Sequence, residues 1–296
     1  MRAIDPSQDA GIRIEAALAQ ALALACAMGA PAKLSSALHY AVFPGGARIR
    51  PRLTLSVAQA CGDDVPALSG AAAAAVELLH CASLVHDDLP CFDGADTRRG
   101  KASVHKAFGE ALAVLAGDGL IILAFETIAT ADAAQPQRAI ALSRIIAQAT
   151  GMPGGIVAGQ AWESEPSIDL VRYQQSKTGS LFAGAAKAGA CAAGADPQPW
   201  AALGFKLGEA FQVADDIRDI CCNATDIGKP IGQDAAHGRP NAVSEIGLRG
   251  AVHRLSGLID EAVASVPECS GQSALREKIE RESRQFLPRD AALAVA

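Results

Sequence analysis

Two acidic clusters, each at the end of an apolar helical pattern, constrain the fold of this chain most strongly. The first cluster, Asp87, Asp88 and Asp93, follows the apolar run from Gly70 to Val85. The second, in the segment from Asp215 to Asp219, ends another helical pattern more than a hundred residues later. Carboxylates at helical spacing repel one another. The sequence therefore predicts that both clusters face one cavity and share a cationic ligand.

The spacing within the second cluster indicates what that ligand is. Asp215 and Asp219 are separated by about 400° of helical rotation and share a face, whereas Asp216 lies about 100° to the side. Carboxylate oxygens without Cys or His suit Mg²⁺, which commonly bridges to substrate phosphates. The alternative is a solvated acidic helix end. It explains one cluster better than it explains two, the first of which is followed by Arg98-Arg99.

The composition favours helices. Half of the residues are hydrophobic but only 4% are aromatic, so the core must consist mainly of Ala, Leu, Val and Ile. Alanine is the strongest helix former, and runs with the alternation typical of strands are scarce. We expect an all-α fold, a single domain over residues 1–296 with about ten or more helices.

Turn and cap residues divide the chain into helices. Pro66 suits the first turn of the helix that delivers Asp87, Pro90 ends that helix, and Asp169 is a candidate N-cap. The segments 94–103 and 222–239 are predicted to be irregular. The predicted helices cover residues 9–28, 34–42, 48–61, 66–87, 109–130, 136–150, 156–163, 170–179, 180–193, 197–219, 242–265 and 272–286.

Charge and hydropathy exclude several classes of function. The net charge is −6, and no basic stripe or zinc-finger spacing indicates nucleic acid. The apolar run from Gly70 to Val85 is too short to span a bilayer, and no apolar signal segment directly follows Met1 to Gln8. The 8 cysteines show no disulfide framework. We expect a cytoplasmic protein with reduced cysteines and no membrane span.

Both acidic motifs carry a family resemblance. Asp87-Asp88-x-x-x-x-Asp93 with Arg98-Arg99-Gly100 resembles the first aspartate-rich motif of trans-isoprenyl diphosphate synthases. Phe211-Gln-Val-Ala-Asp-Asp-Ile-Arg-Asp219 resembles the second. The similarity runs from about Phe43 to Pro240. It implies an all-helical fold around a deep central cavity, usually as a homodimer. It also implies Mg²⁺-dependent condensation of isopentenyl diphosphate with an allylic diphosphate (dimethylallyl, geranyl or farnesyl).

The resemblance also implies roles for individual residues. Asp87 and Asp93 resemble ligands of two Mg²⁺ and Asp215 the ligand of a third, with Asp88, Asp216 and Asp219 as further ligands or their supports. Arg98, Lys177 and Lys229 would hold the allylic diphosphate. Arg50, His80 and Arg99 would hold isopentenyl diphosphate. Thr178 and Gln212 would offer oxygen dipoles to the carbocation. Arg239 stands where the family commonly has lysine, and it keeps the charge.

One position departs from the family pattern. The family usually has Gly-Gly-Lys before the first Arg of this segment, and here the third position is Ala47. Either Arg48 compensates for the missing lysine or isopentenyl diphosphate binds more weakly. The departure opens the alternative that this chain is a non-catalytic partner subunit of a heteromeric synthase. The two intact acidic motifs argue against that alternative.

The helix before the first motif indicates the product length. Ser83 and Ala82 lie four and five residues before Asp87, about one turn deeper in the cavity. Family members that stop at fifteen carbons often resemble one another in having an aromatic residue at the fifth position. With Ala82 there, the expected product is geranylgeranyl diphosphate, with Leu78 or Leu79 as the floor. Farnesyl diphosphate synthase is the runner-up, and a terpene cyclase fits less well because it usually lacks the second motif.

Overall fold

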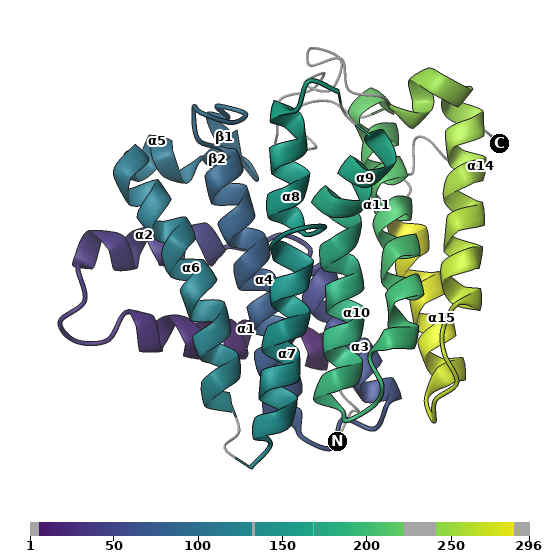
Figure 1. The fold of residues 1–296 in the computed structure, drawn as a ribbon, viewed down its shortest axis with the longest axis horizontal. Coiled ribbons are helices and arrows are strands. Elements are labelled where there is room, and N and C mark those ends of the chain that lie inside the picture. The colour runs from purple at the N-terminus through teal and green to yellow at the C-terminus, as the bar shows by residue number, and fades with distance from the viewer. Residues whose placement is uncertain (1–5, 132–133, 168, 222–240, 287–296) are drawn as a thin grey trace.

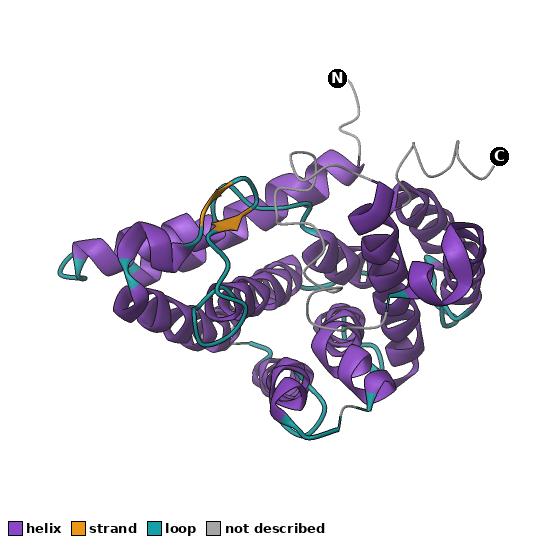
Figure 2. Ribbon diagram, turned by 90° about the horizontal axis from the view of Figure 1, so that it is seen from above, coloured by secondary structure: helices purple, strands orange, loops and turns teal. Residues whose placement is uncertain are grey.

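The computed structural model describes residues 6–131, 134–167, 169–221 and 241–286. Within these ranges the chain is almost entirely helical (Figure 1), which confirms the all-α prediction. The described strands are two residues long each, β1 (Thr97–Arg98) and β2 (Lys101–Ala102), and they form an antiparallel hairpin. The hairpin lies in the segment predicted to be irregular (Figure 2). Strands this short produce no alternation that a sequence pattern could reveal.

Thirteen α-helices are described, together with short 3₁₀ and π turns. The turns that matter for the site are η1 (Trp162–Ser164) and the π turn η2 (Gln175–Gly179). The helices are α1 (Pro6–Ala25), α2 (Ala32–Val42), α3 (Ile49–Ala60), α4 (Pro66–Asp87), α5 (Val104–Phe108), α6 (Glu110–Ala131), α7 (Pro136–Thr150), α8 (Ile156–Ala161), α9 (Leu170–Gln174), α10 (Ser180–Ala192), α11 (Ala201–Cys221), α14 (Ala242–Ala264) and α15 (Gln272–Ser283).

Several predicted boundaries are confirmed. Helices α4 and α7 have the predicted ends, and Asp169 caps α9 by accepting a hydrogen bond from the Arg172 N–H at 3.2 Å. The helix predicted over residues 170–179 is different, because α9 passes into the π turn η2 before Lys177. The predicted irregular segment 222–239 lies outside the described residues.

Helix α4 lies at the centre of the bundle. It is buried along most of its length, and its small alanine side chains let α3, α6 and α10 pack closely against it. A smaller apolar cluster joins α11 to α14 and includes Phe286. Helices α4 and α11 run toward the same end of the bundle (Figure 1), so both acidic clusters arrive at that end.

Among the described helices, two are long and apolar enough to cross a membrane by length and composition. The apolar window of α4 is 83% buried within the protein, which is the ordinary environment of a core helix. The window of α6 is only 39% buried, and its exposed side chains include Val114, Leu115 and Ile122. Helix α6 therefore presents an apolar face outside the core.

Candidate active site

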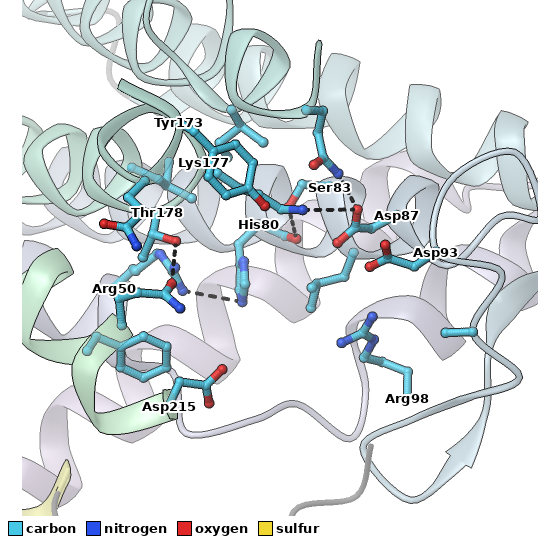
Figure 3. A pocket seen from close by; sticks show the side chains of 18 of the residues that line it. Arg50, His80, Ser83, Asp87, Asp93, Arg98, Tyr173, Lys177, Thr178 and Asp215 are labelled. Carbon is cyan, nitrogen blue, oxygen red and sulfur yellow. Dashed lines mark hydrogen bonds and ion pairs between the residues drawn. The ribbon is translucent and has the colours of Figure 1, made fainter. Parts of the chain in front are cut away.

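A cavity of about 250 Å³ lies where α4, α8, the π turn η2 and α11 meet (Figure 3). Asp87 and Asp93 line it from one side, and Asp215 and Asp219 line it from α11. Each acidic cluster therefore places two of its three aspartates on one cavity, as the sequence predicted. The predicted site residues that line it are Arg50, His80, Ser83, Asp87, Asp93, Arg98, Lys177, Thr178, Gln212, Asp215 and Asp219.

The end of α4 folds back on itself. The Asp93 N–H donates a hydrogen bond to the Asp87 carbonyl oxygen at 3.0 Å, in the turn that contains Pro90. Proline cannot donate a backbone hydrogen bond and so ends the helix here, as expected. The fold-back explains how two carboxylates six residues apart in sequence reach the same cavity wall.

Asp88 and Asp216 are placed differently from the other four aspartates. Their exposed fractions are 2% and 3%. Asp88 accepts a hydrogen bond from Arg98 Nε at 3.0 Å. Asp216 accepts hydrogen bonds from the Ala242 N–H at 2.8 Å and from Gln212 Nε2 at 3.2 Å. These two carboxylates hold neighbouring groups in position behind the cavity wall.

Gln212 also links the two walls of the site. The Thr178 hydroxyl donates a hydrogen bond to Gln212 Oε1 at 3.3 Å. A chain of hydrogen bonds therefore runs from Thr178 through Gln212 to Asp216 and on to the first residue of α14. This chain fixes Thr178 and Gln212, the two oxygen-bearing side chains for which the family resemblance implies carbocation stabilisation.

Asp87 carries partners that sequence reasoning missed. Gln160, on α8, donates a hydrogen bond from Nε2 to Asp87 Oδ1. Lys177 Nζ lies 3.9 Å from the same oxygen. Burial raises the pKa of Asp87, and the negative charge of Asp93 adds to this, while the positive charge of Lys177 opposes it. A cation bound here would relieve the cost of a buried negative charge.

Lys177 is itself held by residues outside the predicted set. Its Nζ lies 2.6 Å from Glu163 Oε1, and the Tyr173 hydroxyl donates to the same oxygen at 2.7 Å. No motif in the sequence marked Glu163, Tyr173 or Gln160. The close approach at Gly159, where a Cβ would come within 2.5 Å of the Lys177 backbone nitrogen, is a contact between distant segments that the sequence does not show.

Arg50 and His80 form a half-buried pair at the cavity. The Arg50 guanidinium lies over the Phe182 ring at 4.5 Å, and its Nη1 is 3.4 Å from His80 Nε2. Burial lowers the pKa of Arg50 to about 10, and burial together with nearby arginines lowers that of His80 well below its usual value. Among the described residues, the buried Arg50 Nε has no hydrogen-bond acceptor. An anionic ligand would supply one.

Arg98 ends strand β1 after the first motif, and Arg99 follows it in the turn of the hairpin. Arg99 has a left-handed backbone (φ 54°), and its guanidinium packs against Gly46, where a Cβ would approach it to 3.1 Å. Its charge is one of those that lower the pKa of His80. Arg98 lines the cavity directly. Lys229 and Arg239, the remaining predicted cations, lie outside the described residues.

The sequence left open whether Arg48 compensates for the lysine missing at position 47. The structure shows that it does not. Its side chain points into the core, where Nη1 lies 2.7 Å from Glu77 Oε1 and Nε lies 2.8 Å from Glu15 Oε1. Its Nη2 also donates to the Val42 carbonyl oxygen at 2.9 Å. The guanidinium is therefore committed to three acceptors away from the cavity.

The two predicted chain-length residues have different surroundings. Ser83 lines the cavity, and its hydroxyl donates to the His80 carbonyl oxygen at 2.8 Å. Ala82 is 1% exposed and lies in the main hydrophobic core, as do Leu78 and Leu79. Ala82 is five residues before Asp87, which is about 140° around the helix from it.

The carboxylates of the cavity fit Mg²⁺ ions that are also coordinated by a bound substrate. Within the described ranges, no three His, Cys, Asp or Glu side chains gather closely enough to hold a metal ion by themselves. Mg²⁺ usually keeps several waters and binds through one or two carboxylates together with substrate phosphates. The carboxylates lie on facing walls, beside Arg50, which lacks an anionic partner. This arrangement suits Mg²⁺ ions whose coordination shell is completed by the oxygens of a bound diphosphate.

Comparisons with known proteins give a consistent result. A family model described as Polyprenyl synthetase matches residues 31–273. Geranylgeranyl diphosphate synthase of Cereibacter sphaeroides is 57% identical over 283 residues, covering 96% of this chain and 98% of that protein. The enzyme of the same name from Rhodobacter capsulatus is 53% identical over 275 residues, covering 93% and 95%.

A solved structure extends the comparison to the fold. The crystal structure of geranyltransferase from Helicobacter pylori, complexed with magnesium and isoprenyl diphosphate, superposes with a TM-score of 0.81. The two sequences are 25% identical, and the match covers 96% of this chain and 100% of that one.

Proposed function

The chain belongs to the polyprenyl synthetase family, and we propose that it is a geranylgeranyl diphosphate synthase. It is a prenyltransferase that condenses isopentenyl diphosphate with allylic diphosphates. The observation that carries the proposal is the cavity with Asp87 and Asp93 on one wall and Asp215 and Asp219 on the other. The two relatives named geranylgeranyl diphosphate synthase support the length of the product.

The four cavity-facing aspartates would hold the metal. We propose about three Mg²⁺ per site, two at Asp87 and Asp93 and one at Asp215, with Asp219 beside it. Bound Mg²⁺ acts as a Lewis acid that neutralises the charge developing on the departing diphosphate. Asp88 and Asp216 contribute by fixing Arg98 and Gln212.

The remaining cavity residues bind the allylic substrate and protect the carbocation. Lys177 and Arg98 donate to the allylic diphosphate, whose negative charge grows as the carbon–oxygen bond breaks. Lys229, outside the described residues, is proposed to reach the same group. The oxygens of Thr178 and Gln212 stabilise the positive carbon. Apolar side chains in the wall, including Leu84 and Leu181, keep water from capturing it.

Isopentenyl diphosphate is proposed to bind beside the half-buried Arg50. The unpartnered Arg50 Nε, the neutral imidazole of His80 and the charge of Arg99 together form its diphosphate subsite. Arg239 adds a charge from the segment outside the described residues. The departing diphosphate takes up the proton that the carbocation formed by condensation loses as it becomes the new allylic product, so this mechanism requires no general base from the protein.

We propose that the protein is cytoplasmic, has one domain and acts as a homodimer. The apolar face of α6, which includes Leu115 and Ile122, is the surface that a second copy would cover. Light scattering should give twice the chain mass for the wild type. The mass should fall for Ile122→Lys, because a charge at an apolar interface is costly to bury.

The test of the function uses the purified chain alone. It is incubated with isopentenyl diphosphate, Mg²⁺ and each allylic primer, and the products are measured by mass. Geranylgeranyl diphosphate supports the proposal. A product that stops at fifteen carbons would indicate the farnesyl alternative. Absence of elongation with every primer would favour the non-catalytic partner subunit.

A further inference from the structure

Among the described residues, Glu163 makes the closest contact with the ammonium group of Lys177, the lysine proposed to bind the allylic diphosphate. Its Oε1 accepts hydrogen bonds from Lys177 Nζ at 2.6 Å and from the Tyr173 hydroxyl at 2.7 Å. The side chains of Lys177 and Glu163 are 20% and 25% exposed, so water screens the pair only partly. Glu163 belongs to none of the aspartate-rich motifs, and it does not line the cavity.

The backbone supports this contact from both sides. Gly159, on α8, lets this helix approach the π turn so closely that a Cβ there would lie 2.6 Å from the Lys177 Cα. The turn η1 that follows α8 carries Glu163. π turns are uncommon and are often found at functional sites. Here the π turn η2 brings Lys177 and Thr178 to the same cavity wall.

The geometry leaves part of the ammonium group for a ligand. A lysine ammonium has three N–H donors. Glu163 Oε1 is the one acceptor within hydrogen-bond distance that the described residues supply, since Asp87 Oδ1 lies at 3.9 Å. Lys177 lines the cavity, so its remaining donors can reach a phosphate oxygen there.

We propose that Glu163 is a positioning residue for the prenyl transfer, which anchors the Lys177 ammonium so that its other donors meet the departing diphosphate. The inference rests on the proposed function. A lysine stem has considerable rotamer freedom, and an anchored donor needs no reorganisation when the charge develops. Tyr173, which donates to the same oxygen and lies with its ring 5.6 Å from Lys177 Nζ, holds the anchor in turn.

The anchor should affect turnover more than substrate binding. The negative charge of Glu163 repels the diphosphate even as it fixes the lysine, so the two effects partly cancel in the ground state. In the transition state the diphosphate carries more charge, and donor placement matters more. Loss of the anchor should therefore lower kcat and leave KM for the allylic substrate nearly unchanged.

Glu163→Gln keeps the shape of the side chain and removes its charge. We expect kcat to fall about tenfold or more, as when a transition-state hydrogen bond is weakened, and KM to change less than about threefold. Tyr173→Phe should give a smaller loss in kcat, because Glu163 still holds the ammonium. Glu165→Gln, on an exposed residue two positions away, is the matched control and should keep wild-type kinetics.

A double-variant cycle tests whether Glu163 acts through Lys177. In a Lys177→Met background, Glu163→Gln should cause no further loss in kcat. The same fold loss in both backgrounds would overturn the proposal, and so would wild-type kcat in the single variant. A purely structural role for Glu163 would instead lower the Tm and leave kcat of the folded fraction unchanged.

A crystal structure of the wild type with Mg²⁺ and inorganic diphosphate gives a readout that needs no turnover. It should show Lys177 Nζ bonded to Glu163 Oε1 and to a phosphate oxygen at the same time. A Lys177 that leaves Glu163, or a diphosphate bound elsewhere, would overturn the inference. Failure of the wild type to elongate any primer would instead count against the proposed function.

Discussion

Arg48 Nη1 lies 2.7 Å from Glu77 Oε1 inside the bundle, where the two side chains are 5% and 2% exposed. The pair links the start of α3 to the middle of the central helix α4. It also explains why the arginine beside Ala47 is no substitute for a substrate-binding lysine. Removing one partner from such a pair leaves an uncompensated charge in the core.

We predict that Glu77→Leu lowers the free energy of unfolding by about 3–5 kcal/mol, because Arg48 is left buried without its closest counter-charge. Urea denaturation followed by circular dichroism measures the change. The double variant Arg48→Met, Glu77→Leu should recover much of the loss. A double variant as unstable as the single one would contradict this account of the pair.

Ala47→Lys should strengthen the binding of isopentenyl diphosphate. A lysine at this position adds a positive charge next to Gly46 and Arg99, where the diphosphate subsite is proposed. We expect KM for isopentenyl diphosphate to fall by about twofold to fivefold, and KM for the allylic primer to stay the same. Steady-state kinetics with each substrate varied in turn measures both values. Gln20→Lys, at an exposed position on α1, controls for net charge.

Two phenylalanine substitutions locate the wall that limits product length. Ser83→Phe places a ring in the cavity and should shorten the main product from twenty to fifteen carbons. Ala82→Phe, which the sequence also predicts to shorten the product, places the ring in the packed core at a cost of about 1–3 kcal/mol. Mass analysis and Tm of both variants separate the two positions. Full-length product from a folded Ser83→Phe variant would show that another wall sets the length.

His80 should make the protein less stable in mild acid. Its pKa in the folded state lies well below the usual 6.5, first because it is buried and then because of Arg50. The unfolded chain therefore binds more protons below about pH 6.5, and stability present above this pH is lost as pH falls.

The loss from this one histidine is at most about 1.4 kcal/mol per pH unit. Urea midpoints measured between about pH 7 and pH 5 should fall more steeply for the wild type than for His80→Gln. The buried carboxylates of Asp87 and Asp88 are present in both proteins, so their titration cancels in the comparison. Equal slopes would show that His80 titrates normally.

The sequence predicted those parts of the site that depend on local spacing. Pro66 and Pro90 bracketed α4, and the four-residue spacing of Asp215 and Asp219 placed both on one helical face. Helical rotation put Asp216 to the side of that face, but which of Asp88, Asp216 and Asp219 would support the ligands instead of facing the cavity stayed open. The placement of Asp88 and Asp216 depends on Arg98 and on the Ala242 N–H, which are tertiary partners.

Contacts between distant segments account for the other omissions. Glu163 appears in the sequence as an ordinary acidic residue, and only the approach of α8 to the π turn places it on Lys177. Arg48 appears as a free charge beside Ala47 until the fold buries it against Glu77. A sequence pattern does not show which acceptor a long side chain reaches in the folded protein.

The central claim is that both acidic clusters hold one diphosphate through magnesium. Calorimetric titration of a non-ionisable thiolo analogue of an allylic diphosphate tests it, with the wild type, Asp87→Asn and Asp215→Asn, each with and without Mg²⁺. We predict Mg²⁺-dependent binding to the wild type that is weakened at least about tenfold in either variant. Binding that does not depend on Mg²⁺, or that only one of the two substitutions weakens, would contradict the claim.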